Sequence, residues 1–370
     1  MQIVITGADG FMGRNLRLRL AEAGQGQVLA VTRDTPPQAL RAALEGADFV
    51  FHLAGVNRPK DPAEFVAGNT QLTQTVCDLL AATGRRVPLL LASSAQAVLD
   101  NPYGRSKRLA EEAVQAYAAQ TGAQATVFRL NNVFGKWCRP HYNSAVATFC
   151  HQIARGLPIT VNDPAAPLQL VHVDDVIDAF LQVLARPEAP GGFAEAGPVY
   201  RTTVGELAGM LQEFAASRQT LVTPRVGSGL VRALYSTYVS YLPVSAFDYP
   251  LPMHADARGT FVEMLKTPDC GQFSYFTAHP GVTRGEHYHH TKTEKFLVIA
   301  GRAQFEFRQV LTGETHTIVT QGSEARVVET VPGYTHNIRN IGSDLLVVML
   351  WANEIFDRQR PDTVALKVHP

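Results

Sequence analysis

The sequence predicts two consecutive domains, an α/β domain with a doubly wound parallel sheet followed by an all-β jelly roll. The 370 residues exceed what one ordinary hydrophobic core holds. The chain opens with a short apolar strand, a glycine turn and a helical pattern, the order found where α/β sheets bind ligands. From Arg258 onward, strand-like apolar runs separated by glycine turns replace the helical pattern. We place the boundary within residues 227–252, rich in Tyr, Pro and Leu, which gives domains 1–246 and 247–370.

Composition and charge exclude several classes of function. Lysine plus arginine equals aspartate plus glutamate, 33 each, and no basic run is present, so nucleic acid is not expected as a partner. No secretory leader pattern and no apolar run of about 18 residues occur, and we expect a cytoplasmic protein without a membrane span. The four cysteines are scattered without a Cys-x-x-Cys pair, which predicts ordinary buried thiols: Cys77, Cys138, Cys150 and Cys270.

The first element is the strand Gln2–Ile5, followed by a turn with three glycines and a helix. Glycines allow a pyrophosphate to approach the backbone, and the helix N-terminus offers amide donors and a positive dipole. We therefore predict dinucleotide binding, the alternative being a tight strand-to-helix turn without a ligand. The candidate contacts are Gly7, Asp9, Gly10, Phe11, Met12, Gly13 and Arg14.

The second strand, Gln27–Thr32, ends in Arg33 where a carboxylate would hold a free ribose 2′-hydroxyl. An arginine at this position suits a 2′-phosphate, and Arg14 would add a second positive charge. The sequence therefore favours NADPH. Asp34, one position later, leaves NADH open, and Arg33 as a solvated surface residue is the structural alternative.

A tyrosine and a lysine four residues apart, Tyr103 and Lys107, follow the apolar strand Leu89–Ser94. At this spacing the two side chains share one face of a helix. A free tyrosine keeps its proton up to a pKa of about 10, and a neighbouring ammonium group lowers that pKa. Tyr103 could then donate a proton to a carbonyl oxygen beside a hydride donor.

The glycine turn, the strand from Asp48 to Gly55, Asn69, Ser94 and the Tyr103/Lys107 pair together resemble the extended short-chain dehydrogenase/reductase family. Most members of that family act on nucleotide sugars. The resemblance implies a Rossmann-type sheet in which Ser94 polarises the substrate carbonyl, Tyr103 donates the proton, and Lys107 lowers the pKa of Tyr103 and holds the nicotinamide ribose. It further implies that Asp48 lies near the adenine, that Leu53 and Ala54 contact the cofactor and that Asn69 supports the site. The segment from serine to tyrosine is shorter than usual in the family, which leaves Ser93 open as the catalytic serine.

Candidate substrate contacts follow two strands of this domain. The stretch 126–135 resembles the family's Arg-x-x-Asn-Val-x-Gly segment, where the substrate half of the site begins. Arg129 could equally be a structural arginine, Asn132 a capping residue and Lys136 a surface lysine. Asn57 and Arg58, just past the cofactor strand, are candidates by position. The substrate set is Asn57, Arg58, Ser94, Arg129, Asn132 and Lys136.

In the second domain, residues 281–301 and 332–340 resemble the two motifs of the cupin family. His287 and His289 alternate onto one strand face. With Glu294 and His336 they would form a site of three histidines and one carboxylate, which suits zinc or another divalent metal. Histidines packed in a polar barrel mouth are the alternative.

A competing signal comes from residues 256–263 and from Arg284-Gly285-x-His287, which also resemble the metal-independent sugar-nucleotide 3,5-epimerase branch of the cupins. In that branch the matching histidine is a base. His287 cannot be both a metal ligand and a free base. Because His289 and His336 are also present, we favour metal ligation.

Over nearly its whole length the chain resembles a family of bifunctional enzymes of capsular-polysaccharide and O-antigen synthesis, through residues 52–59, 271–277 and 350–357. The family epimerises and reduces UDP-2-acetamido-2,6-dideoxy-β-L-arabino-hexos-4-ulose toward UDP-N-acetyl-L-fucosamine, and its members are homodimers. A 4-ketone makes the proton at C3 acidic, so epimerisation must precede reduction. The epimerisation base is open among His290, Lys295, Tyr334 and Glu263.

Two alternative functions remain. The first is a reductase of another UDP-4-keto sugar whose cupin is a structural or regulatory module. The second is a non-catalytic NADP(H) sensor with a ligand-binding barrel, which would not need the Ser94, Tyr103 and Lys107 set.

Overall fold

The computed structural model describes the chain except residues 60, 189, 253, 257–258, 262–263, 266, 268–270 and 355–358. It divides into two compact units that interleave along the chain. The first comprises Met1–Phe134, His141–Ser144 and Leu168–Thr202, and the second comprises Gly135–Pro140, Ala145–Pro167 and Thr203–Pro370. Cys77 and Cys150 are buried thiols and Cys138 is partly buried, whereas Cys270 lies outside the described residues.

The first unit is built on a six-stranded sheet of order β2-β1-β3-β4-β5-β8, with every neighbouring pair parallel. The strands are β1 (Gln2–Thr6), β2 (Gln27–Val31), β3 (Phe49–His52), β4 (Leu89–Ser94), β5 (Ala125–Leu130) and β8 (Gly192–Ala194). The chain winds outward from β1 in both directions, and this confirms the predicted doubly wound sheet. Ligands bind where such a sheet reverses its order, at the carboxyl ends of the strands.

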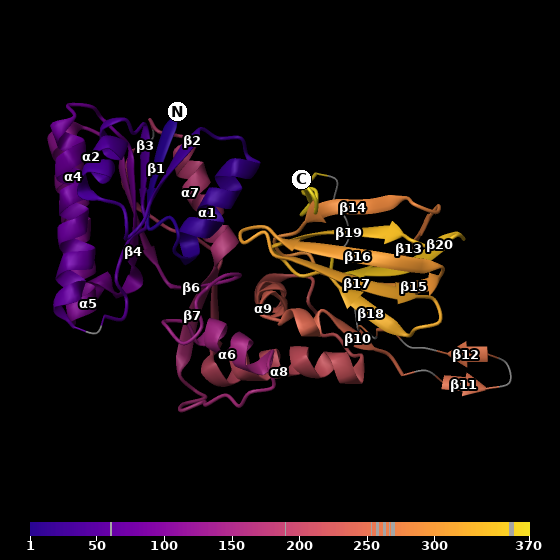
Figure 1. Ribbon diagram of the computed structural model, residues 1–370. Coiled ribbons are helices and arrows are strands. Elements are labelled where there is room, and N and C mark those ends of the chain that lie inside the picture. The colour runs from indigo at the N-terminus through magenta and orange to yellow at the C-terminus, as the bar shows by residue number, and fades with distance from the viewer. Residues whose placement is uncertain are drawn as a thin grey trace. The chain divides into compact units, whose positions relative to one another are not determined.

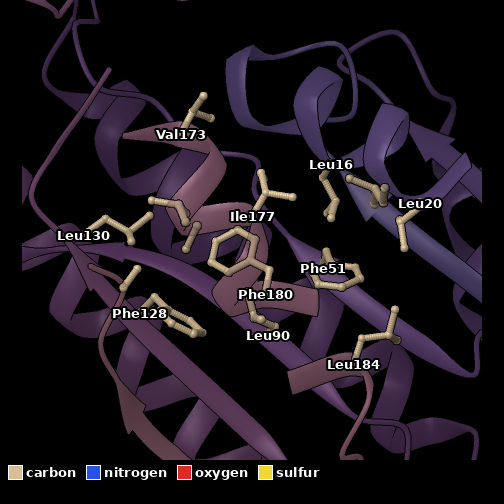
Figure 2. Packing of buried hydrophobic residues seen from close by; sticks show 14 of the residues in the cluster. Leu16, Leu20, Phe51, Leu90, Phe128, Leu130, Val173, Ile177, Phe180 and Leu184 are labelled. Atoms are coloured by element: carbon tan, nitrogen blue, oxygen red, sulfur yellow. The ribbon is translucent and has the colours of Figure 1, made fainter. Parts of the chain in front are cut away.

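Helices cover both faces of this sheet (Figure 1). On one face α1 (Phe11–Glu22) and α7 (Val173–Leu184) bury Leu16, Leu20 and Phe180 against Phe51 and Phe128 of the strands (Figure 2). The other face is covered by α2 (Pro37–Glu45), α4 (Leu72–Ala82) and α5 (Pro102–Thr121). Strand residues are apolar on both faces, as expected for a parallel sheet covered by helices.

Shorter elements complete the first unit. They are α3 (Ala63–Phe65), a π-helical turn (Val66–Gln71), a 3₁₀ turn (Ala95–Val98), and the small sheet β6 (Asn132–Phe134), β7 (Pro167–His172) and β9 (Val199–Thr203).

The second unit contains an antiparallel barrel made of two five-stranded sheets, which confirms the predicted jelly roll (Figure 1). One sheet has the order β10 (Asp248–Pro250), β18 (Arg326–Glu329), β15 (Glu294–Ala300), β20 (Leu346–Ala352), β13 (Gln272–Ala278). The other has the order β17 (Thr315–Gln321), β16 (Arg302–Gln309), β19 (Tyr334–Asn340), β14 (Thr283–Tyr288), β21 (Val364–Ala365). A hairpin of β11 (His254–Asp256) and β12 (Gly259–Phe261) lies between β10 and β13 in the chain. Phe296, Phe305 and Val348 are among the apolar residues of the barrel core.

Three helices belong to the same unit as the barrel: α6 (Ala145–Ile153), α8 (Val204–Thr220) and α9 (Gly229–Ser240). Arg218 of α8 forms an ion pair with Glu329 of β18, and Lys295 of β15 lies 2.7 Å from the same carboxylate. Tyr235 of α9 also donates to Glu329. A buried polar cluster therefore joins α8 and α9 to the outside of the barrel. Among the described residues, no helix has the length and apolar character needed to cross a membrane.

Candidate active site and metal centre

The glycine turn after β1 packs so closely against neighbouring backbone that Gly7 and Gly13 leave no room for a side chain. Gly7 has a φ of 68°, and a Cβ there would lie 2.8 Å from the backbone nitrogen of Ala54. A Cβ on Gly13 would lie 2.3 Å from the carbonyl oxygen of Gly7. Helix α1 starts at Phe11 with no acidic residue in its first turn and no side-chain cap, so its first N–H groups remain available for an anion.

The neighbouring strand ends complete a surface suited to a dinucleotide. Ala8 N–H donates to the Val31 carbonyl at the end of β2, and Ala54 N–H donates to Thr6 Oγ1. Leu53 N–H donates to the Thr6 carbonyl. The turn is thereby tied to both flanking strands, and the exposed Arg33 follows β2 two positions after Val31. Among the other candidates, Asp9 and Arg14 are exposed and Phe11 and Met12 are partly buried.

Asp48 lies at the amino ends of the strands, away from the carboxyl ends where the glycine turn lies. Its carboxylate accepts a hydrogen bond from Gln2 N–H at 2.8 Å and pairs with Arg85 at 2.7 Å. In the parallel register Thr6 is opposite His52, so Asp48 lies level with the start of β1. The structure therefore does not bring Asp48 together with the glycine turn, because the residue precedes its strand whereas the cofactor candidates follow theirs.

Tyr103, Ser94 and Asn57 do come together. Helix α5 begins at Pro102, with Asn101 Oδ1 accepting from Gly104 N–H. The Tyr103 hydroxyl donates to Asn57 Oδ1 at 3.0 Å. Burial raises the pKa of Tyr103, while its hydrogen bond with Ser94 acts to lower it. The tyrosine thus holds its proton beside a serine hydroxyl, as a proton donor must.

Lys107 lies one helical turn further on and is buried, with Nζ donating to the Ala92 carbonyl at 3.2 Å. Burial lowers the pKa of Lys107 to about 8, and Glu111 acts in the opposite direction. A Cβ on Gly55 would lie 3.1 Å from Lys107 Nζ and 3.0 Å from Asn69 Oδ1. The backbone at Gly55 therefore passes directly over the lysine.

Asn69 fastens the loop after β3 to helix α5. Its Nδ2 donates to the Val56 carbonyl and to Ser106 Oγ, and its Oδ1 accepts from Val56 N–H at 2.8 Å. Asn69 lies in the π-helical turn, a type of distortion that often marks functional sites. This clamp holds Asn57, the next residue of the loop, at the Tyr103 hydroxyl. Phe65, which sequence analysis did not single out, packs on the Tyr103 ring with 5.5 Å between ring centroids.

Ser93 and Arg129 belong to a separate buried network. Ser93 Oγ donates to Glu111 Oε1 at 2.5 Å, and Arg129 Nη2 donates to Glu111 Oε2 at 2.6 Å. Arg129 also stacks over Phe193 at 4.3 Å. These contacts favour Ser94 over Ser93 as the serine facing Tyr103, and they give Arg129 a structural partner. Glu111 itself was not found from the sequence.

The remaining substrate candidates are spread over both units. Arg58 is exposed and directly follows Asn57, and Asn132 is an exposed residue that opens β6. Lys136 belongs to the second unit, where it is buried with its Nζ 5.4 Å from the Trp137 ring.

The four candidate metal ligands do converge. One ligand atom from each of His287, His289, Glu294 and His336 lies within 4.8 Å of the others. His287 is on β14, Glu294 opens β15 and His336 is on β19, so the two barrel sheets each contribute. His289 directly follows β14 and is buried.

The charges around this cluster favour a cation at its centre. Burial and the neighbouring histidines lower the pKa of His287 to about 3, and burial lowers that of His336. Burial acts to raise the pKa of Glu294, yet His289 and His336 hold it well below its usual value. The lowered pKa values of His287 and His336 favour neutral rings beside an ionised Glu294, the form in which these side chains bind metals.

The hydrogen bond of His289 provides a further test of fit. Its Nδ1 lies 2.5 Å from the Asp362 carbonyl, which can only accept, so Nδ1 bears the proton. Nε2 then faces Glu294 Oε2 at 3.1 Å. Either a proton or a metal cation between these two atoms satisfies both of them. His336 Nε2 lies 3.5 Å from the same Glu294 oxygen, so this carboxylate faces two imidazole rings. The residues present thus fit a bound metal ion.

A pocket of about 180 Å³ leads to this cluster. Its walls are mainly apolar, with Phe276, Phe296 and Phe305 among them, and Arg284 is a charged residue in its lining. Arg284 lies over the Phe276 ring at 5.0 Å. Such a pocket, apolar with a few polar groups, is typical of a small-molecule site.

The four base candidates differ in where they lie. Lys295 points away from the metal cluster, because Glu294 points inward and neighbouring strand residues face opposite sides. Tyr334 packs its ring on Phe247 at 5.1 Å, and burial raises its pKa. His290 donates its backbone N–H to Asp362 Oδ1. Glu263 and Arg258 of the competing motif lie outside the described residues.

Comparisons with known proteins agree with this description. Residues 3–194 match the family model of the NAD-dependent epimerase/dehydratase family, and residues 254–364 match that of the polysaccharide biosynthesis C-terminal domain. The chain is 56% identical to UDP-2-acetamido-2,6-beta-L-arabino-hexul-4-ose reductase of Pseudomonas aeruginosa, over 100% of this chain and 99% of the relative.

Among solved structures, the capsular polysaccharide assembling protein CapF of Staphylococcus aureus matches over 100% of both chains, with 42% identity and a TM-score of 0.68. The UDP-glucose 4-epimerase of Thermus thermophilus, solved with NAD, matches 58% of this chain and 84% of its own at 22% identity and a TM-score of 0.50, and it supports the fold alone. The model match over residues 3–194 and the full-length relative place the chain in the NAD-dependent epimerase/dehydratase family.

Proposed function

We propose that the chain is a bifunctional nucleotide-sugar enzyme. It would epimerise C3 of UDP-2-acetamido-2,6-dideoxy-β-L-arabino-hexos-4-ulose and then reduce the C4 ketone, toward UDP-N-acetyl-L-fucosamine for capsule or O-antigen. The observation that supports this most is the 56% identity to a UDP-hexulose reductase over the full length of the chain. The reductase step is assigned to residues 1–246 and the epimerase step to residues 247–370, in a homodimer.

The reductase step depends on Tyr103 and its neighbours. NADPH would supply the hydride, and Arg33 with Arg14 would hold its 2′-phosphate. Tyr103 would donate its proton to the C4 oxygen while Ser94 donates a hydrogen bond to the same oxygen. Lys107, held under Gly55, would stabilise the tyrosinate that remains.

Contacts to the substrate would come from polar residues near the strand ends. Asn57 already accepts the Tyr103 hydrogen bond, and a sugar hydroxyl or carbonyl could replace that contact. Arg58 follows it in an exposed position suited to a phosphate. Asn132 and Lys136 remain substrate contacts proposed from the motif. Arg129 remains one as well, although its guanidinium is already paired with Glu111.

The epimerase step is assigned to the barrel pocket. His287, His289, Glu294 and His336 would hold a divalent metal ion, for which zinc suits the ligand set. A bound metal would supply a Lewis acid that makes a proton next to a carbonyl more acidic. The apolar walls formed by Phe276, Phe296 and Phe305 would exclude water from the exchanging carbon.

The chemistry fixes the order of the two steps. The proton on C3 is acidic only while C4 is a ketone, because the ketone delocalises the charge left on C3. Reduction removes the ketone and ends that acidity. Epimerisation in the barrel must therefore come first.

The test is to incubate the full-length protein with the UDP-linked 4-keto-L-arabino sugar in deuterated buffer, with and without NADPH. Deuterium at C3 is followed by NMR and cofactor oxidation by absorbance. We expect exchange without NADPH, and we expect His336→Ala to abolish it while reduction of a pre-epimerised substrate survives. Steady NADPH oxidation with no exchange would instead leave a simple reductase with a structural barrel.

A matched variant separates enzyme from sensor. Tyr103→Phe should stop NADPH oxidation and leave C3 exchange intact. Unchanged oxidation in this variant would remove Tyr103 from the proposed mechanism, and absence of turnover in the unmodified protein would favour a non-catalytic binding role.

A further inference from the structure

The last residues of the chain lie along the strand that leads to the metal cluster. We call residues 359–370 the C-terminal strap. Its strand β21 pairs with β14, placing Ala365 opposite His287 and Val364 opposite Tyr288. Leu366 N–H donates to the Glu286 carbonyl. The strap is thus an added edge strand beside the metal-ligand strand.

Asp362 anchors the start of the strap. Its carboxylate accepts the backbone N–H groups of His290, Thr291 and Lys292 at 2.8, 2.6 and 2.7 Å. It also accepts the Thr291 hydroxyl at 3.0 Å. Four hydrogen bonds to an ionised carboxylate fix this residue firmly, since charge-assisted bonds are about twice as strong as neutral ones. The turn that follows His289 is therefore built around the Asp362 side chain.

The backbone of the same residue holds a metal ligand. The Asp362 carbonyl accepts from His289 Nδ1 at 2.5 Å. This bond leaves Nε2 facing Glu294 Oε2, 3.1 Å away, where the cluster converges. One residue thus fixes both the position of the turn and the tautomer of the ring.

We propose that Asp362 is a positioning residue for the metal centre, acting through His289. The inference depends on the proposed metal site and adds a part to it that no ligand motif contains. Carboxylate removal would free the turn at residues 290–292 and let the carbonyl move away from the ring. Loss of an outer partner of a metal-bound histidine typically weakens metal affinity by about 10–100-fold.

The experiment measures zinc affinity of the full-length protein by competition with a chromogenic chelator. Asp362→Asn and Asp362→Ala are compared with Arg308→Ala, whose guanidinium holds the other end of the strap through the Val368 and Lys367 carbonyls. We expect zinc affinity to fall by about 10-fold or more in both Asp362 variants and to remain unchanged in Arg308→Ala. The absorption spectrum of the cobalt-loaded protein should change only in the Asp362 variants, because it reports ligand geometry.

Equal zinc affinity and equal cobalt spectra in all variants would overturn the role of Asp362 while leaving the metal site intact. Absence of zinc binding in the unmodified protein would overturn the metal site itself. If neither Asp362 variant folds, the zinc-loaded unmodified protein decides, by NMR of ¹⁵N-labelled histidine. Metal on Nε2 of His289 with a proton on Nδ1 supports the inference, and metal on Nδ1 contradicts it.

Discussion

Tyr103 combines three contacts that a proton donor of this kind needs. Phe65 covers one side of its ring, Asn57 accepts its hydroxyl proton, and Ser94 is within hydrogen-bond reach of the same oxygen. Burial raises its pKa, so the proton stays on the phenol until a substrate oxygen competes for it. Lys107, one helical turn away, is buried, and this burial lowers its pKa to about 8.

Removing the Tyr103 hydroxyl should affect chemistry far more than stability. We expect Tyr103→Phe to lower kcat for reduction by about 10²–10⁴-fold, the usual contribution of a positioned acid, with NADPH affinity little changed. Tyr117→Phe on the same helix is the control, since its hydroxyl donates to the Val87 carbonyl and not to a residue of the candidate site. That variant should lose about 1 kcal/mol of stability and keep its kcat. Similar kcat values in the two variants would contradict the role of Tyr103.

The pKa of Lys107 predicts an alkaline limit to activity. In the folded chain this pKa is about 8, below its ordinary value of 10.5. Between these values the unfolded chain binds more protons than the folded one, so the free energy of unfolding rises with pH across this window. Activity should move in the opposite direction, because the ammonium form that stabilises the tyrosinate is lost above about pH 8.

This limit can be measured as kcat/KM for NADPH from neutral to alkaline pH, which reports the free enzyme. Glu111 acts to raise the pKa of Lys107, so Glu111→Gln should move the alkaline fall to lower pH. Glu112→Gln, a neighbouring exposed carboxylate, should leave the profile unchanged. Identical profiles for the two variants would show that Glu111 does not set the charge of Lys107.

At the scale of elements, the end of β4 and helix α5 are locked together. Ser93 bonds to Glu111 on α5, and the adjacent Ser94 faces Tyr103 near the start of the same helix. Arg129 of β5 joins the same carboxylate. Contacts among β4, α5 and β5 therefore fix the distance between the serine and the tyrosine despite the short segment that links them.

The contact between α1 and the glycine turn is the tightest backbone approach in the candidate cofactor site. A methyl group on Gly13 would lie 2.3 Å from the Gly7 carbonyl oxygen and 2.7 Å from Ala8 Cα. Gly13→Ala should therefore push the helix away from the turn, weaken NADPH binding and cost about 1–3 kcal/mol of stability, as overpacking does. Cofactor affinity is read by fluorescence titration, and stability by urea denaturation.

Gly209→Ala is the matched control. Gly209 is an exposed position of α8, where an added methyl group would have no atom of the described residues within 4 Å outside its own helix backbone and chain neighbours. The variant should gain about 0.5–1 kcal/mol, as alanine does in a helix interior, and bind NADPH unchanged. Normal NADPH affinity in Gly13→Ala would show that the turn adapts and does not form the cofactor site.

Local sequence signals predicted the parts of the site that lie close together in the chain. The glycine turn, the Tyr103/Lys107 spacing and the alternation of His287 with His289 each fall within one element or its neighbour. Asp362 was missed because its partner His289 is 73 positions away, and no pattern links them. Asp48 was placed near the adenine by motif alone, whereas the structure places its carboxylate beside Gln2 N–H at the start of β1, because a strand pattern does not say which end faces a ligand.

At the scale of the whole molecule, the two compact units exchange segments along the chain. Residues 135–140 and 145–167 leave the first unit and join the second, together with α8 and α9. The buried pairing of Lys295 and Arg218 with Glu329 ties these helices to the barrel. Composition could not reveal that α6, α8 and α9 belong to the second unit, because their sequences have the same helical character as those of the first unit.

Two separate sites in one chain predict that inactive variants complement each other. Tyr103→Phe should retain epimerisation and His336→Ala should retain reduction, so neither alone converts the 4-keto-L-arabino substrate to the reduced 3-epimer. Mixing them should restore NADPH oxidation after a lag, because the epimerised ketone must leave one chain and bind the other. In deuterated buffer the product should contain deuterium at C3.

The control replaces Tyr103→Phe in the mixture by the double variant Tyr103→Phe/His336→Ala, which should restore nothing. The mixture could also fail to oxidise NADPH while Tyr103→Phe still exchanges C3 deuterium and His336→Ala still reduces a pre-epimerised substrate. This result would mean that the intermediate never leaves the chain that makes it. Restored oxidation with a lag that shortens as Tyr103→Phe is increased would establish a freely diffusing intermediate, because only the supply of epimerised ketone would then limit the rate.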